Sequence, residues 1–119
     1  MKHPSWYYEI YKQVFEYNRN YNNEIMFLDK KYSFKNKKVI EIGAGTGNHA
    51  FEILKCYPSK LILIDYDDNA IAILKKRFNY PNVEIIYSDG FNRLLYGDII
   101  LCFFSIIQQT NIFSFFNRI

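Results

Sequence analysis

The sequence contains few cysteines and no long hydrophobic run. Cys56 and Cys102 lie far apart in apolar surroundings, in neither a CxxC pair nor a spacing typical of metal ligands. We therefore expect buried thiols in a reducing compartment and no metal site. The longest apolar stretch, residues 99–107, is interrupted only by Ser105 and is too short to cross a bilayer as a helix. The N-terminus also lacks the apolar core of a signal peptide, so we predict a cytoplasmic protein with no membrane partner.

The chain has no strong excess of charge of either sign. Its formal net charge is +3, and its basic clusters are confined to residues 35–38 and residues 75–77. The second cluster closes a predicted helix, where cations favour the helix dipole without needing a partner. A nucleic-acid surface would need a broader basic face, so the charge pattern argues against nucleic acid as a partner.

The hydrophobic pattern predicts one α/β domain over residues 1–119. Half of the residues are hydrophobic, which is enough for a packed core. Helical spacing in residues 1–36 predicts an N-terminal helical cap, and strands are predicted at residues 37–42, 61–65, 83–87 and 98–104. Because strands alternate with helices, we expect residues 37–119 to form the first four strands of a Rossmann-like, doubly wound parallel sheet.

Two of the helices between these strands have a clear apolar face. The first carries Ala50, Ile53, Leu54 and Tyr57 on one side and should end before Pro58, which cannot continue it. The second should begin at a cap formed by an aspartate at position 67 or 68. Its predicted buried side chains are Ala70, Ile71, Leu74 and Phe78.

A glycine-rich turn follows the first predicted strand and opens a helix. Its glycines are Gly43, Gly45 and Gly47. Glycine permits positive φ and lets a ligand approach the backbone, and N–H groups at the start of a helix can meet a carboxylate. Asp65 ends the next predicted strand, at a spacing that suits an adenosine-type cofactor with its ribose hydroxyls on this carboxylate.

A third polar site follows the third predicted strand. The Asp89 carboxylate can accept a hydrogen bond from an adenine amine, while the backbone N–H groups of Gly90 and Phe91 can donate to ring nitrogens. Taken singly, Asp65 is equally well explained as a residue that starts a helix, and Asp89 as part of an Asp-Gly turn. In this order, at the carboxyl ends of consecutive strands, they favour one shared ligand.

These motifs resemble those of the class I S-adenosylmethionine-dependent methyltransferases. Residues 41–47, Glu-Ile-Gly-Ala-Gly-Thr-Gly, resemble the first motif of that family, Ile64-Asp65 the second and Ser88-Asp89 the third. Residues 98–105 resemble the strand that ends beside the methyl donor. Residues 6–11 and 21–28 are similar to a subset that includes small-molecule N-methyltransferases, among them amino-sugar dimethyltransferases. The resemblance covers nearly the whole chain.

The resemblance implies S-adenosylmethionine as cofactor and assigns roles to particular residues. At the methionine end of the donor, Glu41 would orient the amino-acid group. The residues that would line this end are Gly43, Ala44, Gly45 and Gly47. Cys102 and Phe103 would lie near the sulfonium. Those implied for the nucleoside are Asp65 on the ribose, Tyr66 against the adenine, and Asp89 on the adenine amine beside Gly90 and Phe91. Tyr7 or Tyr11 would close the site from above.

Several departures from related motifs narrow the prediction. Asn48 stands where a GxGxxG motif needs its last glycine, which argues against a nucleotide-cofactor oxidoreductase. No Asn/Asp-Pro-Pro-Tyr/Phe motif follows the fourth strand, which argues against methylation of DNA bases. No Pro-Cys pair is present, so Cys102 is not a candidate cytosine-attacking nucleophile. We interpret His49 as a helix-surface residue rather than a general base, and no catalytic residue is assigned.

The resemblance also leaves alternatives open. Family members normally continue with a fifth strand and an antiparallel pair that often carry the acceptor pocket. Our leading expectation is an S-adenosylmethionine-dependent methyltransferase that acts on a small molecule such as an amine. The alternatives are a donor-binding half-domain that is inactive without a partner chain, and an oxidoreductase. An apolar stripe predicts contact with a second copy or a complementing chain, and it consists of Ile112, Phe115, Phe116 and Ile119.

Overall fold

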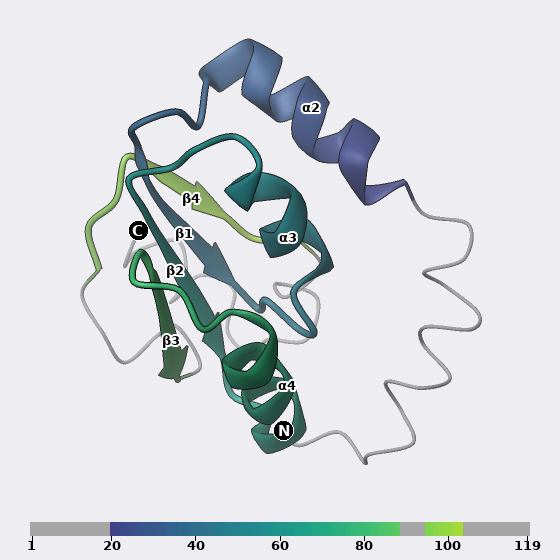
Figure 1. Ribbon diagram of the computed structural model, residues 1–119, viewed down its shortest axis with the longest axis vertical. Helices are drawn as coiled ribbons and strands as arrows, with labels where there is room; N and C mark the ends of the chain where they lie inside the picture. The colour runs from purple at the N-terminus through teal and green to yellow at the C-terminus, as the bar shows by residue number, and fades with distance from the viewer. Residues whose placement is uncertain (1–19, 89–94, 104–119) are drawn as a thin grey trace, which may run out of the picture.

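The computed structural model describes residues 20–88 and 95–103, and these form a parallel sheet with helices packed on it (Figure 1). The elements in chain order are α2 (Tyr21–Tyr32), β1 (Lys38–Ile42), α3 (Asn48–Leu54), β2 (Lys60–Asp65), α4 (Asp68–Arg77), β3 (Val83–Tyr87) and β4 (Ile99–Leu101). The predicted α/β class and the four predicted strands are confirmed. The fourth strand ends at Leu101, earlier than expected.

The strand order places a ligand-binding position at the end of β1. The order is β3-β2-β1-β4, and each neighbouring pair is parallel. The chain therefore leaves β1 on one side for β2 and β3, and returns to its other side for β4. Open α/β sheets bind ligands outside the carboxyl ends of the strands, where the order reverses in this way. Here that position lies beyond Ile42 and Leu101.

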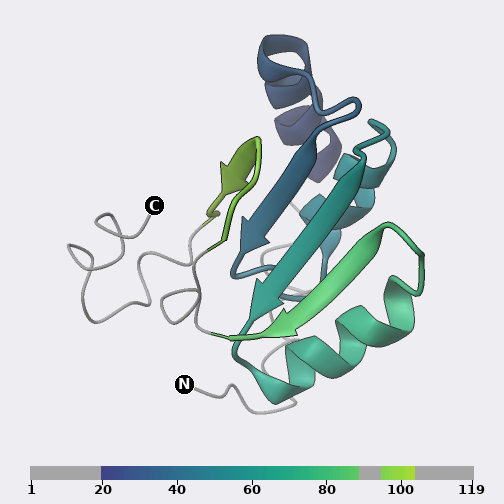
Figure 2. The ribbon, with the colours of Figure 1, turned by 90° about the vertical axis from the view of Figure 1, so that its left-hand side faces the viewer.

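Both faces of the central strands are buried, as expected for a parallel sheet. One face of β1 and β2 contributes Val39, Leu61 and Leu63 to a cluster with side chains from α2, α3 and α4. The described helices accordingly lie on one side of the sheet (Figure 2). The opposite face consists of isoleucines, and these are Ile40, Ile42, Ile62, Ile64 and Ile86.

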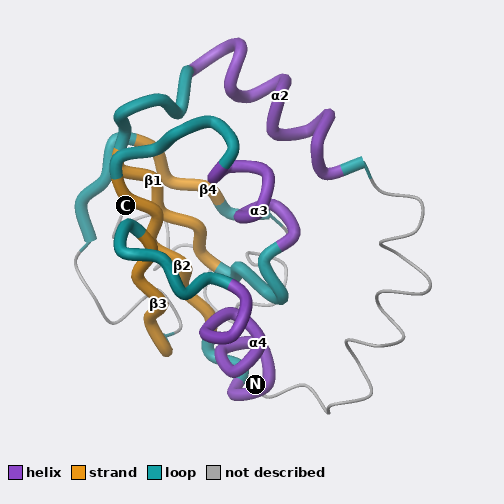
Figure 3. Tube along the Cα trace, in the orientation of Figure 1, coloured by secondary structure: helices purple, strands orange, loops and turns teal. Residues whose placement is uncertain are grey.

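The end of α3 differs from the prediction. The helix stops at Leu54, and the chain continues in tight turns as a loop (Figure 3). Tyr57 takes a left-handed φ of 57° and is 74% exposed, so its assignment to the apolar face was wrong. Its carbonyl accepts a hydrogen bond from the N–H of Asn36, which lies before β1. This long-range contact favours the turn over another turn of helix.

Helix α4 matches its predicted pattern. Asp67 is the N-cap, and its side chain accepts a hydrogen bond from the Asn69 N–H at 2.9 Å. The four predicted apolar side chains are buried, and they are Ala70, Ile71, Leu74 and Phe78. Helix α2 is capped in a similar way by Asn20, and it buries Ile25 against the rest of the core.

The glycine turn between β1 and α3 needs glycine for two different reasons. Gly43, Gly45 and Gly47 all have positive φ, at 75°, 60° and 90°. A Cβ on Gly47 would lie 2.2 Å from the Phe78 ring at the end of α4, whereas a Cβ on Gly45 would meet none of the described atoms within 4 Å. Backbone conformation alone therefore requires glycine at position 45, but packing against α4 also requires it at position 47.

The residues that the structure describes contain neither a candidate membrane span nor a candidate metal site. None of the helices there is both long enough and apolar enough to cross a membrane. The same residues hold no group of three or more His, Cys, Asp or Glu side chains that could bind a metal ion.

We predict that Gly47→Ala destabilises the fold more than Gly45→Ala. Both substitutions force alanine into a left-handed conformation, at a cost of about 1–2 kcal/mol. Gly47→Ala also overpacks the contact with Phe78, so its total loss in the free energy of unfolding should be about 2–5 kcal/mol. Chemical denaturation of both variants without ligand measures the difference. Equal losses would show that α4 does not pack tightly on this turn.

Candidate functional site

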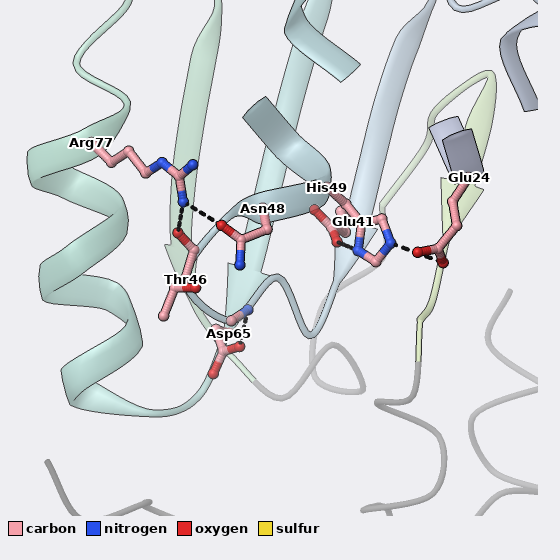
Figure 4. A network of polar contacts seen from close by, with 8 residues as sticks. Glu24, Glu41, Thr46, Asn48, His49, Asp65 and Arg77 are labelled. Atoms are coloured by element: carbon pink, nitrogen blue, oxygen red, sulfur yellow. Dashed lines mark hydrogen bonds and ion pairs between the residues drawn. The ribbon is translucent and has the colours of Figure 1, made fainter. Parts of the chain in front are cut away.

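The glycine turn is bonded to the end of β2. The N–H groups of Gly43 and Ala44 both donate to the Ile64 carbonyl, at 2.8 and 2.9 Å. The Gly45 N–H then donates to Asp65 Oδ2 at 2.8 Å (Figure 4). Asp65 Oδ1 accepts from the N–H of Asp67 at 2.9 Å. The structure thus brings together the first two sequence motifs, and the Asp65 carboxylate joins the turn to the start of α4.

The environment of Asp65 is unusual for an acidic side chain. Only 8% of the residue is exposed. Burial raises the pKa of Asp65 above its usual value, and the backbone hydrogen bonds from Gly45 and Asp67 oppose that shift. With a third backbone bond from Tyr66, three N–H groups reach the carboxylate, whereas an ionised carboxylate has about four acceptor positions. The group can therefore accept a further hydrogen bond from a ligand.

The outer side of the turn is held by Arg77 from the end of α4. Its Nη1 donates to the Thr46 carbonyl at 2.9 Å and to Asn48 Oδ1 at 2.8 Å (Figure 4). The guanidinium also lies 5.4 Å from the ring centres of Phe51 and Phe78. The sequence indicated only a cation that favours the helix dipole. In the fold, Arg77 fixes the turn, and Asn48 supplies an acceptor where a dinucleotide motif would have glycine.

His49 is buried, so its assignment to the helix surface was wrong. The residue is 6% exposed, and its ring stacks on Phe103 with centres 3.7 Å apart and planes 10° apart. Tyr21 of α2 meets the same ring edge-on at 4.8 Å. The physical reason is the position of α3, whose first turn lies between α2 and the residues that follow β4.

Glu41 is the most deeply buried of the predicted site residues that the structure describes. It is 1% exposed, next to the last residue of β1. Glu41 Oε2 lies 3.8 Å from His49 Nδ1, while His49 Nε2 lies 3.4 Å from Oε1 of Glu24 on α2. Figure 4 shows the imidazole between the two carboxylates. These contacts join the end of β1 to both α2 and α3.

The remaining predicted residues divide into two groups. Tyr66 follows Asp65 and is partly buried, and Cys102 and Phe103 follow β4. Phe103 packs on the face that carries the helices, whereas Cys102 packs on the isoleucine face. Cys56 is buried elsewhere, and neither cysteine is in a disulfide. Some predictions lie outside the described residues, and these concern Tyr7, Tyr11, Asp89, Gly90, Phe91 and the apolar stripe of residues 112–119.

Sequence reasoning missed two residues of this site, His49 and Arg77. His49 lies four positions before the buried Ile53, and side chains with this spacing share one face of a helix. That signal was available. Arg77 had no comparable local signal, because its acceptor Thr46 lies 31 residues earlier in the chain.

A family model described as ribosomal RNA adenine dimethylase matches residues 8–114. The ribosomal RNA small subunit methyltransferase A of Mycoplasma capricolum is 38% identical to the chain over 82 residues. This match covers 68% of the chain and 29% of the relative, so the chain spans less than a third of that protein's length.

Solved structures agree on the fold. A structure from Methanococcus maripaludis aligns with a TM-score of 0.77 and 18% identity, covering 92% of this chain and 52% of the other. The S-adenosylmethionine-bound amino pentose methyltransferase CalS10 from Micromonospora echinaspora aligns with a TM-score of 0.75 and 15% identity, covering 89% and 47%. Identities this low establish a shared fold and nothing about the acceptor.

The comparisons correct the predicted acceptor. The family model and the Mycoplasma relative both name ribosomal RNA, so the expectations of a small-molecule, amino-sugar-type acceptor and against a nucleic-acid partner were wrong. The net charge of +3 was a poor basis for predicting the acceptor, because the charge summed over the whole chain does not indicate which molecule binds at one site. The broader prediction of a class I S-adenosylmethionine-dependent methyltransferase is confirmed. The chain belongs to the ribosomal RNA adenine dimethylase family.

Proposed function

We propose that this chain binds S-adenosylmethionine at its glycine turn and methylates adenine in ribosomal RNA in the cytoplasm. The observation that carries the proposal is the hydrogen bond between the Gly45 N–H and Asp65, in a chain that belongs to the ribosomal RNA adenine dimethylase family. This bond joins the two motifs that would hold opposite ends of the donor. The relative named for small-subunit ribosomal RNA supports the same acceptor.

The residues at the turn suit such a ligand. The space beside Gly45 is open, so a ligand can lie directly against the backbone there. Asp65 has acceptor capacity left for ribose hydroxyls. The other residues that we propose around the donor are Glu41, Gly43, Ala44, Gly47, Tyr66, Asp89, Gly90, Phe91, Cys102, Phe103 and Tyr11. We also propose that residues 1–36 form a cap over a core of residues 37–119.

The chemistry asks little acid–base work of the protein. S-adenosylmethionine supplies a methyl group that its positive sulfonium already activates. The chain's own residues then align the donor and keep water away from it, and alignment alone can lower a barrier by several kcal/mol. The rigid turn, held by Asp65 on one side and Arg77 on the other, is suited to that task. In the transfer, the adenine nitrogen bonds the methyl carbon as the carbon–sulfur bond breaks, and the amine, whose lone pair is delocalised into the ring, loses a proton. We assign no residue to accept that proton.

We predict that Asp65→Ala weakens the binding of S-adenosylhomocysteine by about 1–3 kcal/mol, the scale for losing a buried polar partner. Isothermal titration calorimetry measures the change, and thermal melting verifies that the variant is folded. Glu84→Gln is a matched control, because this carboxylate lies on β3 and pairs with Lys60 at 3.0 Å. Unchanged affinity of folded Asp65→Ala would contradict the placement of the ribose.

Donor binding should also weaken on acidification, and at a higher pH than for an ordinary aspartate. Ribose hydroxyls donate to the ionised carboxylate, so binding is strong above the raised pKa of Asp65 and is lost as the pH falls through it. Without ligand the sign is opposite. The folded state keeps this proton longer than the unfolded state, so Asp65 lowers the free energy of unfolding as the pH rises from 3.8 to its raised pKa.

Affinities for S-adenosylhomocysteine measured from about pH 4 to about pH 8 test this dependence. Asp65→Asn has no carboxyl to titrate there, so its affinity should vary less with pH than that of the unchanged protein. Parallel curves for the two proteins would show that Asp65 does not meet the ribose.

The acceptor is tested by methyl transfer from a labelled donor. We expect label in the adenines of unmethylated small-subunit ribosomal RNA, and about tenfold less label with Asp65→Ala at donor concentrations below the dissociation constant. Amino sugars serve as the small-molecule comparison. Donor binding without label in the RNA would contradict the proposed acceptor while leaving the proposed donor site standing.

A further inference from the structure

Four segments of the chain meet at the imidazole of His49. Nδ1 lies 3.8 Å from Oε2 of Glu41 on β1, and Nε2 lies 3.4 Å from Oε1 of Glu24 on α2. Phe103, just after β4, covers one face of the ring, and Tyr21 of α2 meets its edge. Figure 4 shows the ring between the two carboxylates. The imidazole therefore joins the cap helix to the strand that ends at the proposed donor site.

Both ring nitrogens face groups that accept hydrogen bonds. Ionised carboxylates donate none, so a neutral imidazole donates to one of them and turns a lone pair toward the other. An imidazolium donates toward both. The 3.4 Å contact with Glu24 is a long hydrogen bond, whereas the 3.8 Å separation from Glu41 exceeds hydrogen-bond distance and leaves an electrostatic contact. Among residues 20–88 and 95–103, the contacts given for the ring place Glu24 from α2 and Glu41 from β1 beside it, together with the Tyr21 phenol.

A positive charge on the ring would matter most for Glu41. Its side chain is 1% exposed, while that of Glu24 is 34% exposed. A buried carboxylate is costly unless a positive charge lies beside it. With His49 protonated, the three side chains carry one net negative charge between them.

We propose that His49 is a positioning residue, which holds the Glu41 carboxylate for the donor's ammonium group by linking it to Glu24 on helix α2. The inference rests on the proposed function, because the role of Glu41 toward the donor comes from it. It adds that α2 contributes to donor binding through Glu24. It also assigns a role to a residue that the sequence motifs do not include.

Two ligands separate this role from a purely structural one. S-adenosylhomocysteine carries the amino-acid end, whereas 5′-methylthioadenosine lacks it and binds through the nucleoside alone. His49→Gln keeps a donor near the position of Nε2 and loses the one that faces Glu41. We expect it to weaken S-adenosylhomocysteine about two- to tenfold, with 5′-methylthioadenosine unchanged. His49→Asn is also neutral and loses the contact with Glu24, so it should weaken S-adenosylhomocysteine at least as much.

A variant of Glu24, the partly exposed partner of His49, tests the same contact if changes at the buried ring disturb folding. Glu24→Gln removes one charge from α2 and should weaken S-adenosylhomocysteine selectively, as His49→Gln does. The double variant should show no additional loss, because the two residues act through one contact. Glu84→Gln serves as the control, and thermal melting reports on folding.

The outcomes distinguish this inference from the proposed function. Equal losses for both ligands would show that His49 only supports the fold, and would overturn the inference. So would unchanged binding of both ligands to folded His49→Gln and Glu24→Gln. Binding of neither ligand to the unchanged protein would overturn the proposed donor site itself.

Discussion

The candidate site depends on the attachment of the glycine turn to the end of β2. Three successive N–H groups, those of Gly43, Ala44 and Gly45, donate to the Ile64 carbonyl and the Asp65 carboxylate. The turn crosses from one strand to the tip of its neighbour, so its shape is set by two strands rather than one. A carboxylate in this place builds the turn, and under the proposed function it also accepts the hydroxyl groups of the donor's ribose.

The same turn is supported from outside by α4. Gly47 gives the room that the Phe78 ring occupies, and Arg77 bonds the backbone of Thr46 and the side chain of Asn48. The departure from the dinucleotide motif at Asn48 therefore has a structural counterpart. The asparagine side chain helps to hold the turn. The last glycine of a dinucleotide motif lets a helix pack closely, and in this chain the close packing occurs one residue earlier, at Gly47.

Fold and acceptor are separate properties in this chain. An amino pentose methyltransferase shares the fold at a TM-score of 0.75, yet the family model that matches residues 8–114 is that of ribosomal RNA adenine dimethylase. A sheet edge that holds a methyl donor serves many acceptors, because acceptor choice depends on other surfaces. Composition and charge were therefore poor guides to the acceptor, although the motifs were good guides to the family.

Local patterns in the sequence determined the strands, the glycine turn and the buried face of α4, because alternation and helical spacing act between neighbouring residues. Only the tertiary structure decided the surroundings of His49, Arg77 and Tyr57. Their partners include Glu24, Thr46 and Asn36, which lie in distant parts of the sequence. Such contacts form only when helices and strands pack together, so the periodicity of the sequence does not predict them.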